Sequence, residues 1–249
     1  MKRVKLVVAY DGTNYCGWKV QKNGETIESV LNRAIGELTG EEIHVMGSSR
    51  TDAGVHACGN VAVFDTEARM ASDKFSYALN QRLPEDIRIQ DSCEVPADFH
   101  PRFQKTVKTY EYRILNREFP LPAYRFNSHF TYRKLDVERM RQAAAYLIGE
   151  HDFQSFCAAG AQVKTTVRTI YALDVEKQGD LIILRITGNG FLYNMVRIIA
   201  GTLMKIGQGD WEPERIPEIL AGCDRQLAGP TAPARGLTLM EIHFKGEKG

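Results

Sequence analysis

The chain has 249 residues, of which 43% are hydrophobic and 25% charged, as is usual for a globular protein. This composition excludes a collagen, a coiled coil and a mostly disordered chain. The longest apolar runs, such as residues 181–184, are far too short to cross a bilayer, and no signal-peptide pattern follows Met1. We therefore expect a protein that does not interact with membranes.

The cysteines are five in number and widely spaced, at positions 16, 58, 93, 157 and 223. There is no C-x-x-C motif and no Cys/His cluster, so the sequence predicts no zinc site. Scattered thiols of this kind favour a reducing compartment, and we expect the protein in the cytoplasm.

The net charge of +1 does not by itself indicate nucleic-acid binding, but the charges are unevenly distributed. Residues 102–141 hold ten Lys or Arg and four acids, so this segment carries +6 and the remainder of the chain −5. The same segment, called here the basic segment, contains eight of the 23 aromatic residues. Interleaved basic and aromatic side chains suit contacts with phosphates and bases. An amphipathic strand followed by a solvated basic loop explains the pattern equally well.

In the first half of the chain, hydrophobic periodicity predicts a strand, a helix, two strands, a helix and a strand. In that order they cover residues 2–10, 26–38, 43–49, 60–66, 72–83 and 87–95. Thr26 is placed to cap the first helix and Gly40 to end it, while Pro84 ends the second helix.

In the second half, the same order of elements is predicted over residues 107–116, 136–149, 169–176, 181–187, 191–206 and 237–244. Two β-α-β-β-α-β units predict an α+β protein made of two ferredoxin-like halves with antiparallel sheets. The boundary falls near residues 99–104, which divides the chain into domains 1–103 and 104–249. Between the predicted elements, residues 116–132 and 152–168 form loops long enough to be functional or mobile.

This topology occurs in RNA-binding and small-molecule-binding proteins alike, so it names no function. The aromatic signature of the RNA-recognition module is missing from the predicted strands 60–66 and 181–187. An enzyme, a noncatalytic RNA-binding protein and a small-molecule-binding protein all remain open at this point.

Arg197 is the only charged residue between Phe191 and Met204, in a predicted helix that is apolar on nearly every side. An arginine in such a helix needs a partner, usually a carboxylate. Two explanations follow: a structural ion pair, or a pair with a functional acid. The preceding Gly188-Asn189-Gly190 resembles a dinucleotide-binding loop only superficially, because position 193 is a tyrosine and a hairpin precedes it.

Asp52 lies in a run of small residues, 47–57, that joins two predicted strands. Small neighbours would let a flat ligand approach the carboxylate closely. Arg50 could keep that carboxylate ionised. An aspartate that merely caps a turn would fit the same pattern. His56 also suits catalysis, but no second acid or nucleophile stands beside it in the sequence.

Further motifs occur in a fixed order along nearly the whole chain. They are Tyr10–Thr13 with Gly17–Trp18, Arg50–Ala57, Leu79–Asn80 with Leu83–Ile87, Phe99–Phe103, Lys108–Arg113, His151–Asp152–Phe153 with Ser155–Phe156, Gly190–Leu192 with Met195–Arg197, and Ala232–Ala234 with Gly236–Leu237. Together these motifs resemble the tRNA pseudouridine synthase A family. Lys19, Glu28 and Ser49 depart from the family pattern, which leaves open a paralogue with an altered choice of uridine.

The resemblance implies an isomerase that converts uridine to pseudouridine at positions 38, 39 and 40 of the tRNA anticodon stem-loop, without metal or nucleotide cofactor. It implies that Asp52 is the catalytic aspartate, which either adds covalently to the nucleotide or removes the ribose C2′ proton. Tyr110 matches the tyrosine that contacts the substrate, and Arg197 matches the arginine that pairs with the catalytic carboxylate. Arg50 is expected to bind phosphate or displace nucleotides while the target uridine leaves the stack. The family also implies a homodimer and an active-site cleft between the two halves.

Overall fold

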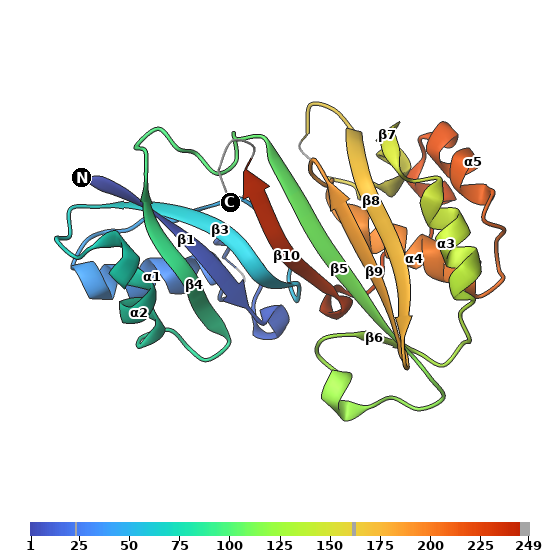
Figure 1. The fold of residues 1–249 in the computed structure, drawn as a ribbon, viewed down its shortest axis with the longest axis horizontal. Coiled ribbons are helices and arrows are strands. Elements are labelled where there is room, and N and C mark those ends of the chain that lie inside the picture. The colour runs from blue at the N-terminus through green and yellow to red at the C-terminus, as the bar shows by residue number, and fades with distance from the viewer. Residues whose placement is uncertain (23, 161–162, 245–249) are drawn as a thin grey trace. The chain divides into compact units, whose positions relative to one another are not determined.

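The structure is a computed structural model that describes residues 1–22, 24–160 and 163–244. The chain divides into two compact units. Unit 1 comprises residues 1–105 together with 239–249, and unit 2 comprises residues 106–238. Each unit combines helices with an antiparallel sheet, so the predicted α+β class is confirmed (Figure 1). No helix in the described part of the chain is long and apolar enough to span a membrane.

The sheet of unit 1 consists of β1 (Lys2–Tyr10), β2 (Met46–Gly47), β3 (His56–Thr66), β4 (Ile87–Val95) and β10 (Leu237–Phe244). β1 is central: it pairs antiparallel with β4 on one side and with β3 on the other. β2 and β10 both pair with β3. Alternate residues of β1, namely Val4, Leu6 and Val8, are fully buried, so one face of the sheet forms the core.

Two helices, α1 (Ile27–Thr39) and α2 (Phe75–Asn80), cover one face of the unit 1 sheet (Figure 1). α1 begins and ends where the sequence predicts. The side chains of Thr26 and Ser29 each accept a hydrogen bond from the other residue's backbone N–H, and Gly40 ends the helix in the left-handed conformation. The predicted helix over residues 72–83 is shorter, because residues 72–74 form a 3-10 turn and α2 ends four residues before Pro84.

Unit 2 contains β5 (Thr106–Asn116), β6 (His129–Thr131), β7 (Gly149–Asp152), β8 (Val167–Gln178) and β9 (Leu181–Gly188). The strand order is β5-β9-β8-β7, all antiparallel, with β6 running parallel to the end of β5. The predicted hairpin between β8 and β9 is present, with Gly179 at positive φ in its turn.

Short 3-10 helices occur between the longer elements in both units, at residues 12–14, 122–124, 154–156, 225–227 and 234–236.

The helices of unit 2 are α3 (Val137–Ala145), α4 (Met195–Gly207) and α5 (Arg215–Gly222). α4 is the core helix, since Ile198, Ile199, Leu203 and Ile206 are almost entirely buried. Asp136 caps α3 as predicted, by accepting hydrogen bonds from the first backbone N–H groups of that helix.

The boundaries of four other predicted elements are wrong. The predicted strand 43–49 is reduced to the two residues of β2, while the strand predicted from residue 60 begins at His56. α3 ends at Ala145, and Gly149 opens β7 rather than closing the helix. α4 begins at Met195, not Phe191, because the preceding turn ends in a left-handed residue. Helical periodicity continues through such a turn, so the sequence pattern alone did not reveal it.

Candidate active site

Asp52 lies on the loop that joins β2 to β3, and its side chain is half-buried. The carbonyl of Asp52 accepts a hydrogen bond from the backbone N–H of Val55 at 3.1 Å, which closes the loop into a tight turn. This turn places the carboxylate at the tip of a short connection between two paired strands. Hydrogen bonds and packing around a short loop of this kind hold its side chains in a defined geometry.

The segment after β1 packs against this loop through backbone contacts. Trp18 N–H donates to the carbonyl of Thr51 at 3.0 Å, and Gly54 N–H donates to the carbonyl of Tyr15 at 3.3 Å. Gly17 adopts a φ of +88°, and a Cβ atom there would lie 2.7 Å from the carbonyl oxygen of Thr51. Only glycine permits this approach. The loop between β2 and β3, residues 48–55, is called here the aspartate loop, and the early Tyr10–Trp18 motif forms one wall of it.

A buried polar network holds the other side of the loop. The hydroxyl of Tyr10 and Oγ1 of Thr51 are 2.7 Å apart, and Asn60 Nδ2 donates to the Tyr10 oxygen at 3.2 Å. The same amide group donates to the carbonyl of Ser49 at 3.0 Å. All four residues are buried, so these groups depend on one another for hydrogen bonds. Sequence reasoning missed Asn60, whose role depends on contacts between residues distant in sequence.

His56, the first residue of β3, is buried beside Asp11. Its Nδ1 accepts a hydrogen bond from Gly12 N–H at 3.1 Å and lies 3.1 Å from Oδ1 of Asp11. Burial raises the pKa of Asp11, but hydrogen bonds from Thr13, together with the electrostatic influence of the nearby His56 ring, outweigh burial and lower that pKa below its ordinary value. The acid that the sequence did not show beside His56 is thus Asp11, and the contact ties the end of the loop to the residues after β1.

Arg50 is exposed on the aspartate loop, and a second arginine stands near it. Arg102 donates from Nε to the carbonyl of Gly47 at 3.0 Å, which attaches it to the start of the loop. Burial and the neighbouring positive charge of Arg50 lower the pKa of Arg102. Two guanidinium groups near one carboxylate-bearing loop create a positive potential there.

On unit 2, Tyr110 lies in the middle of β5, opposite Ile186 of β9. Its side chain is buried, and the edge of its ring meets Phe191 at a centroid distance of 5.3 Å. The pairing of β5 with β9 has no bulge, so Lys108, Tyr110 and Tyr112 point to the same face of the sheet. Lys108 is half-buried, and burial lowers its pKa to about 8.

Arg197 lies in the first turn of α4 and is half-buried. Its Nε donates to the carbonyl of Ala232 at 2.7 Å, and its Nη1 donates to Oδ1 of Asn194 at 2.7 Å. Both acceptors belong to unit 2 and are neutral, and these two bonds help to orient the guanidinium. The pairing of Arg197 with a functional carboxylate stays a prediction.

The segment that holds Arg197 is itself fixed by Tyr112. The buried Tyr112 hydroxyl donates to the carbonyl of Pro233 at 2.9 Å. A Cβ atom on Gly236 would lie 2.7 Å from the Tyr112 ring, so the segment after Ala232 passes directly over that ring. Burial raises the pKa of the Tyr112 phenol, against the opposing influence of Arg197 and Arg235, which keeps the phenol a neutral donor.

Several known proteins are similar to this chain over nearly its whole length. The tRNA pseudouridine synthase family model matches residues 6–104 and 143–245. A tRNA pseudouridine synthase A of Acetivibrio thermocellus is 48% identical over 244 residues, which cover 98% of this chain and 100% of the relative. Those of Ruminiclostridium cellulolyticum and Brevibacillus brevis are 49% and 50% identical over 245 residues, with the same coverage. The chain belongs to the tRNA pseudouridine synthase family.

Among solved structures, a chain of the archaeal box H/ACA sRNP Nop10–Cbf5 complex has a distant likeness. It shares 10% identity and gives a TM-score of 0.34, covering 95% of this chain and 46% of that chain.

The family model matches some of the predicted site residues and leaves out another. Arg50, Asp52 and Arg197 lie within the segments that the family model matches, whereas Tyr110 and most of the basic segment lie between them. The full-length relatives cover that interval as well. The matches to these relatives, at 98% of this chain, therefore extend over the basic segment, which the family model leaves out.

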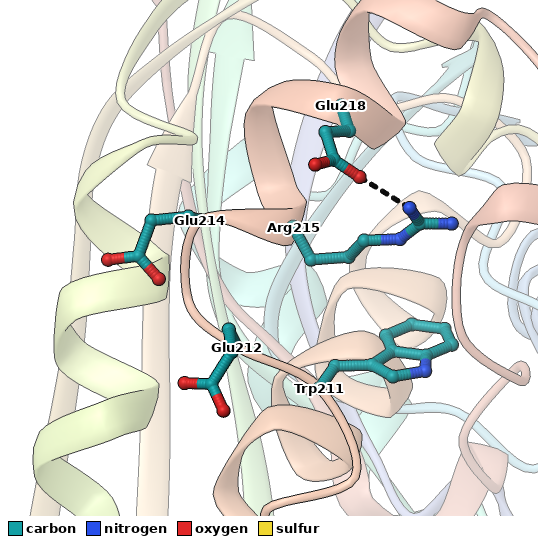
Figure 2. A pocket seen from close by; sticks show the side chains of 5 residues that line it. All are labelled: Trp211, Glu212, Glu214, Arg215 and Glu218. Atoms are coloured by element: carbon teal, nitrogen blue, oxygen red, sulfur yellow. Dashed lines mark hydrogen bonds and ion pairs between the residues drawn. The ribbon is translucent and has the colours of Figure 1, made fainter.

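One cavity in unit 2 does not belong to this site. It has a volume of about 340 Å³ and lies beside α5, lined by Trp211, Glu212, Glu214, Arg215 and Glu218 (Figure 2). Arg215 forms an ion pair with Glu218, and Arg139 donates to Glu212. A carboxylate-rich lining does not suit the phosphates of the RNA that a tRNA pseudouridine synthase modifies. Within the described residues, His, Cys, Asp and Glu form no group of three or more that could hold a metal ion.

Proposed function

We propose that this protein isomerises uridine to pseudouridine at positions 38, 39 and 40 of the tRNA anticodon stem-loop. The observation that carries the proposal is the set of relatives, 48–50% identical over their whole length, that are named tRNA pseudouridine synthase A. The aspartate loop, which is held by hydrogen bonds on both sides, supports the proposal, because it presents a carboxylate among small residues with two arginines nearby. We further propose that the protein works in the cytoplasm as a homodimer.

The reaction breaks the glycosidic bond between N1 and C1′, turns the uracil, and forms a bond between C5 and C1′. C5 loses its proton and N1 gains one, so no oxidant, reductant or metal is needed. In the proposed mechanism the ionised carboxylate of Asp52 starts the reaction, either by adding covalently to the nucleotide or by removing the C2′ proton. Both routes require the target uridine to leave the base stack first.

The other residues have supporting roles in this proposal. Tyr110 packs its ring against the displaced uracil, which its rigid position on β5 favours. Arg197 holds the carboxylate of Asp52 through its planar guanidinium, which suits two parallel hydrogen bonds to one carboxylate. Arg50 binds phosphate or displaces neighbouring nucleotides. The reaction therefore requires residues of both units.

We propose that the two units are variants of one ferredoxin-like topology. In unit 1 the strand order β4-β1-β3-β2 is antiparallel, with α1 between β1 and β2 and α2 between β3 and β4 along the chain. Unit 2 repeats this order of elements as β5, α3, β8, β9 and α4, and its strands β5-β9-β8 repeat the arrangement β1-β3-β2. The sequence-based division into domains 1–103 and 104–249 remains part of this proposal.

The structure refines which residues of the basic segment are suited to RNA. Several of its cations are neutralised by acids, since ion pairs involve Arg113, Arg117, Arg133, Arg139 and Arg141. Arg102 and Arg125 instead donate to backbone carbonyls, which leaves their charge uncompensated by those bonds. Phe103, the exposed residue that follows Arg102 in the sequence, is stacked on His100. Arg125 lies 4.2 Å from the ring centroid of Phe126, which is also exposed. We propose Arg102 and Arg125, each with its neighbouring aromatic residue, as the main RNA contacts of the segment.

The deciding experiment is incubation of the protein with an unmodified tRNA transcript that carries tritium at uracil C5. Tritium release reports formation of the new C5 bond, and mapping of the modified nucleotides tests positions 38, 39 and 40. A protein that binds this tRNA but releases no tritium at stoichiometric concentration would be a noncatalytic RNA-binding protein, and the proposed function would be wrong.

A further inference from the structure

Asn194 has an unusual backbone conformation. It immediately precedes α4 with φ 59° and ψ 9°, in the left-handed region. Among the described residues, only Asn194 and Cys223 combine a positive φ with a side chain. This conformation costs free energy for any residue other than glycine, although asparagine tolerates it better than most. Strain of this kind persists where the surrounding structure, or a function, requires it.

The side chain of Asn194 does not perform the task expected at its position. An asparagine at the N-cap of a helix usually accepts a hydrogen bond from the backbone N–H two or three residues later. Here the side chain makes no capping hydrogen bond to α4. Its Oδ1 accepts instead from Nη1 of Arg197, at 2.7 Å. The left-handed backbone thus accompanies a side chain directed at Arg197 and not at the end of its own helix.

Arg197 is held at a second point on the opposite side. Its Nε donates to the carbonyl of Ala232 at 2.7 Å, while Ala232 N–H donates to the carbonyl of Arg197 at 3.1 Å. A bond at Nε alone leaves the outer part of the guanidinium poorly fixed. The bond from Nη1 to Asn194 adds the second point, so that the plane of the group has one orientation.

We infer that Asn194 is a positioning residue that sets the orientation of the Arg197 guanidinium. This inference rests on the proposed function, in which Arg197 holds the carboxylate of Asp52. A planar donor group is useful to a carboxylate only when its plane is correctly turned, because both hydrogen bonds must align together. Small misplacements of a catalytic group lower the rate far more than they lower stability.

Three substitutions separate the side chain from the backbone. Asn194→Gly accepts the left-handed conformation without strain and removes only the amide side chain. We expect its single-turnover rate to fall on the order of 10- to 100-fold, with tRNA affinity within about threefold of the parent. Asn194→Asp keeps the oxygen and tolerates the backbone, so it should recover most of the rate. Asn194→Ala should lose as much rate as the glycine variant and also melt at a lower temperature.

A spectroscopic measurement tests the inference without the reaction. In the parent, hydrogen bonds at Nε and Nη1 should slow rotation of the Arg197 guanidinium about its Nε–Cζ bond, as observed by NMR of the full-length protein with labelled arginine. Asn194→Gly should speed that rotation, and Asn194→Asp should not. Cys223→Gly is the matched control, since it relieves the other left-handed residue, at the end of α5, and should change neither rotation nor rate.

Parental turnover and parental guanidinium rotation in Asn194→Gly would overturn the inference. So would a loss of rate explained entirely by weaker tRNA binding. Failure of the proposed function gives a different result: the parent itself would release no tritium, while the NMR comparison would still show whether Asn194 orients Arg197.

Discussion

The phenol oxygen of Tyr10 lies 2.7 Å from Oγ1 of Thr51, the residue that immediately precedes Asp52. Through this contact β1 supports the loop that carries the carboxylate. We predict that Tyr10→Phe lowers the free energy of unfolding by about 1–3 kcal/mol, because Thr51 and Asn60 are each deprived of a buried partner. The single-turnover rate should fall by roughly tenfold as the loop loosens.

Tyr15→Phe is a matched control for that variant. Tyr15 is also buried in unit 1, but its hydroxyl donates to Asp86, which is not part of the aspartate loop. Urea denaturation should show a comparable loss of stability, while single-turnover measurements should give a parental rate. Equal rate losses in both variants would show that the Tyr10 effect is general destabilisation and not support of the loop.

Asp52→Asn tests the proposed catalytic carboxylate. The amide is nearly the same size but serves neither as nucleophile nor as base, so turnover should be abolished. Binding of tRNA should remain within roughly tenfold of the parent, because phosphate contacts dominate affinity. Tritium release and filter binding measure the two quantities. Residual activity above about one per cent, with native-like binding, would remove Asp52 from the catalytic role.

Arg197→Lys keeps the positive charge but loses the planar group that reaches Ala232 and Asn194 together. If the role of Arg197 is catalytic, turnover should fall by orders of magnitude and the melting temperature by only a few degrees. If the residue is purely structural, the effect on stability should exceed the effect on turnover: the loss of stability should be large and the rate per folded molecule near-parental. Melting curves and single-turnover rates on the same preparations distinguish these outcomes.

The dependence of tRNA affinity on salt should identify the cations that bind phosphate. Arg102→Glu or Arg125→Glu should flatten the plot of log affinity against log salt concentration, by about one unit of slope for each phosphate that the variant no longer binds. Arg133→Glu serves as the comparison. Arg133 already forms two hydrogen bonds to Asp210, so its reversal should lower stability more than it changes the slope. The same slope in all variants would mean that the basic segment is only a solvated surface.

Lys108 predicts how stability changes with pH. Its pKa in the folded protein is about 8, against an ordinary value of 10.5. Below pH 8 both states carry the proton, and the folded state bears the full cost of a buried charge. Between pH 8 and 10.5 only the unfolded state keeps the proton, so the folded protein gains stability as pH rises. Lys108→Met should remove this gain, which is on the order of 1–3 kcal/mol.

Urea denaturation of the parent and Lys108→Met at several pH values measures the effect of Lys108. Lys134→Met, at an exposed position in the same segment, should leave the pH dependence unchanged. If the free energy of unfolding depends on pH identically in the parent and in the Lys108 variant, burial does not lower the pKa of this amine.

The sequence predicted best those helices and strands whose ends are set by residues close by in the chain, such as capping residues and turns. Thr26 and Gly40 define α1 by capping chemistry, and the strands β1, β4 and β10 have the predicted bounds. Helix α5 was missed, and the start of α4 was misplaced. The left-handed turn at Asn194 keeps the apolar spacing of a helix, so periodicity continues where the helix does not.

In the candidate site, too, the sequence revealed residues that stand out locally and missed residues that act through distant partners. The motif around Asp52 and the isolated charge of Arg197 were visible in the sequence, because each is a short pattern or an exception to one. Asn60 and Asp11 were not, since each acts through a partner 45 or more residues away, His56 in the case of Asp11 and Tyr10 in the case of Asn60. Hydrogen bonds across a sheet are set by strand pairing, which a single sequence does not specify.

The close approach of Gly17 to the backbone of Thr51 has a consequence for engineering. Because backbone atoms on both sides define the fit, no choice of side chains elsewhere would make room for a larger residue at position 17. The aspartate loop is therefore not a portable module. Transplanting residues 47–57 into another scaffold would also require the stretch from Tyr10 to Trp18 and an amide at the position of Asn60, as one interlocked graft.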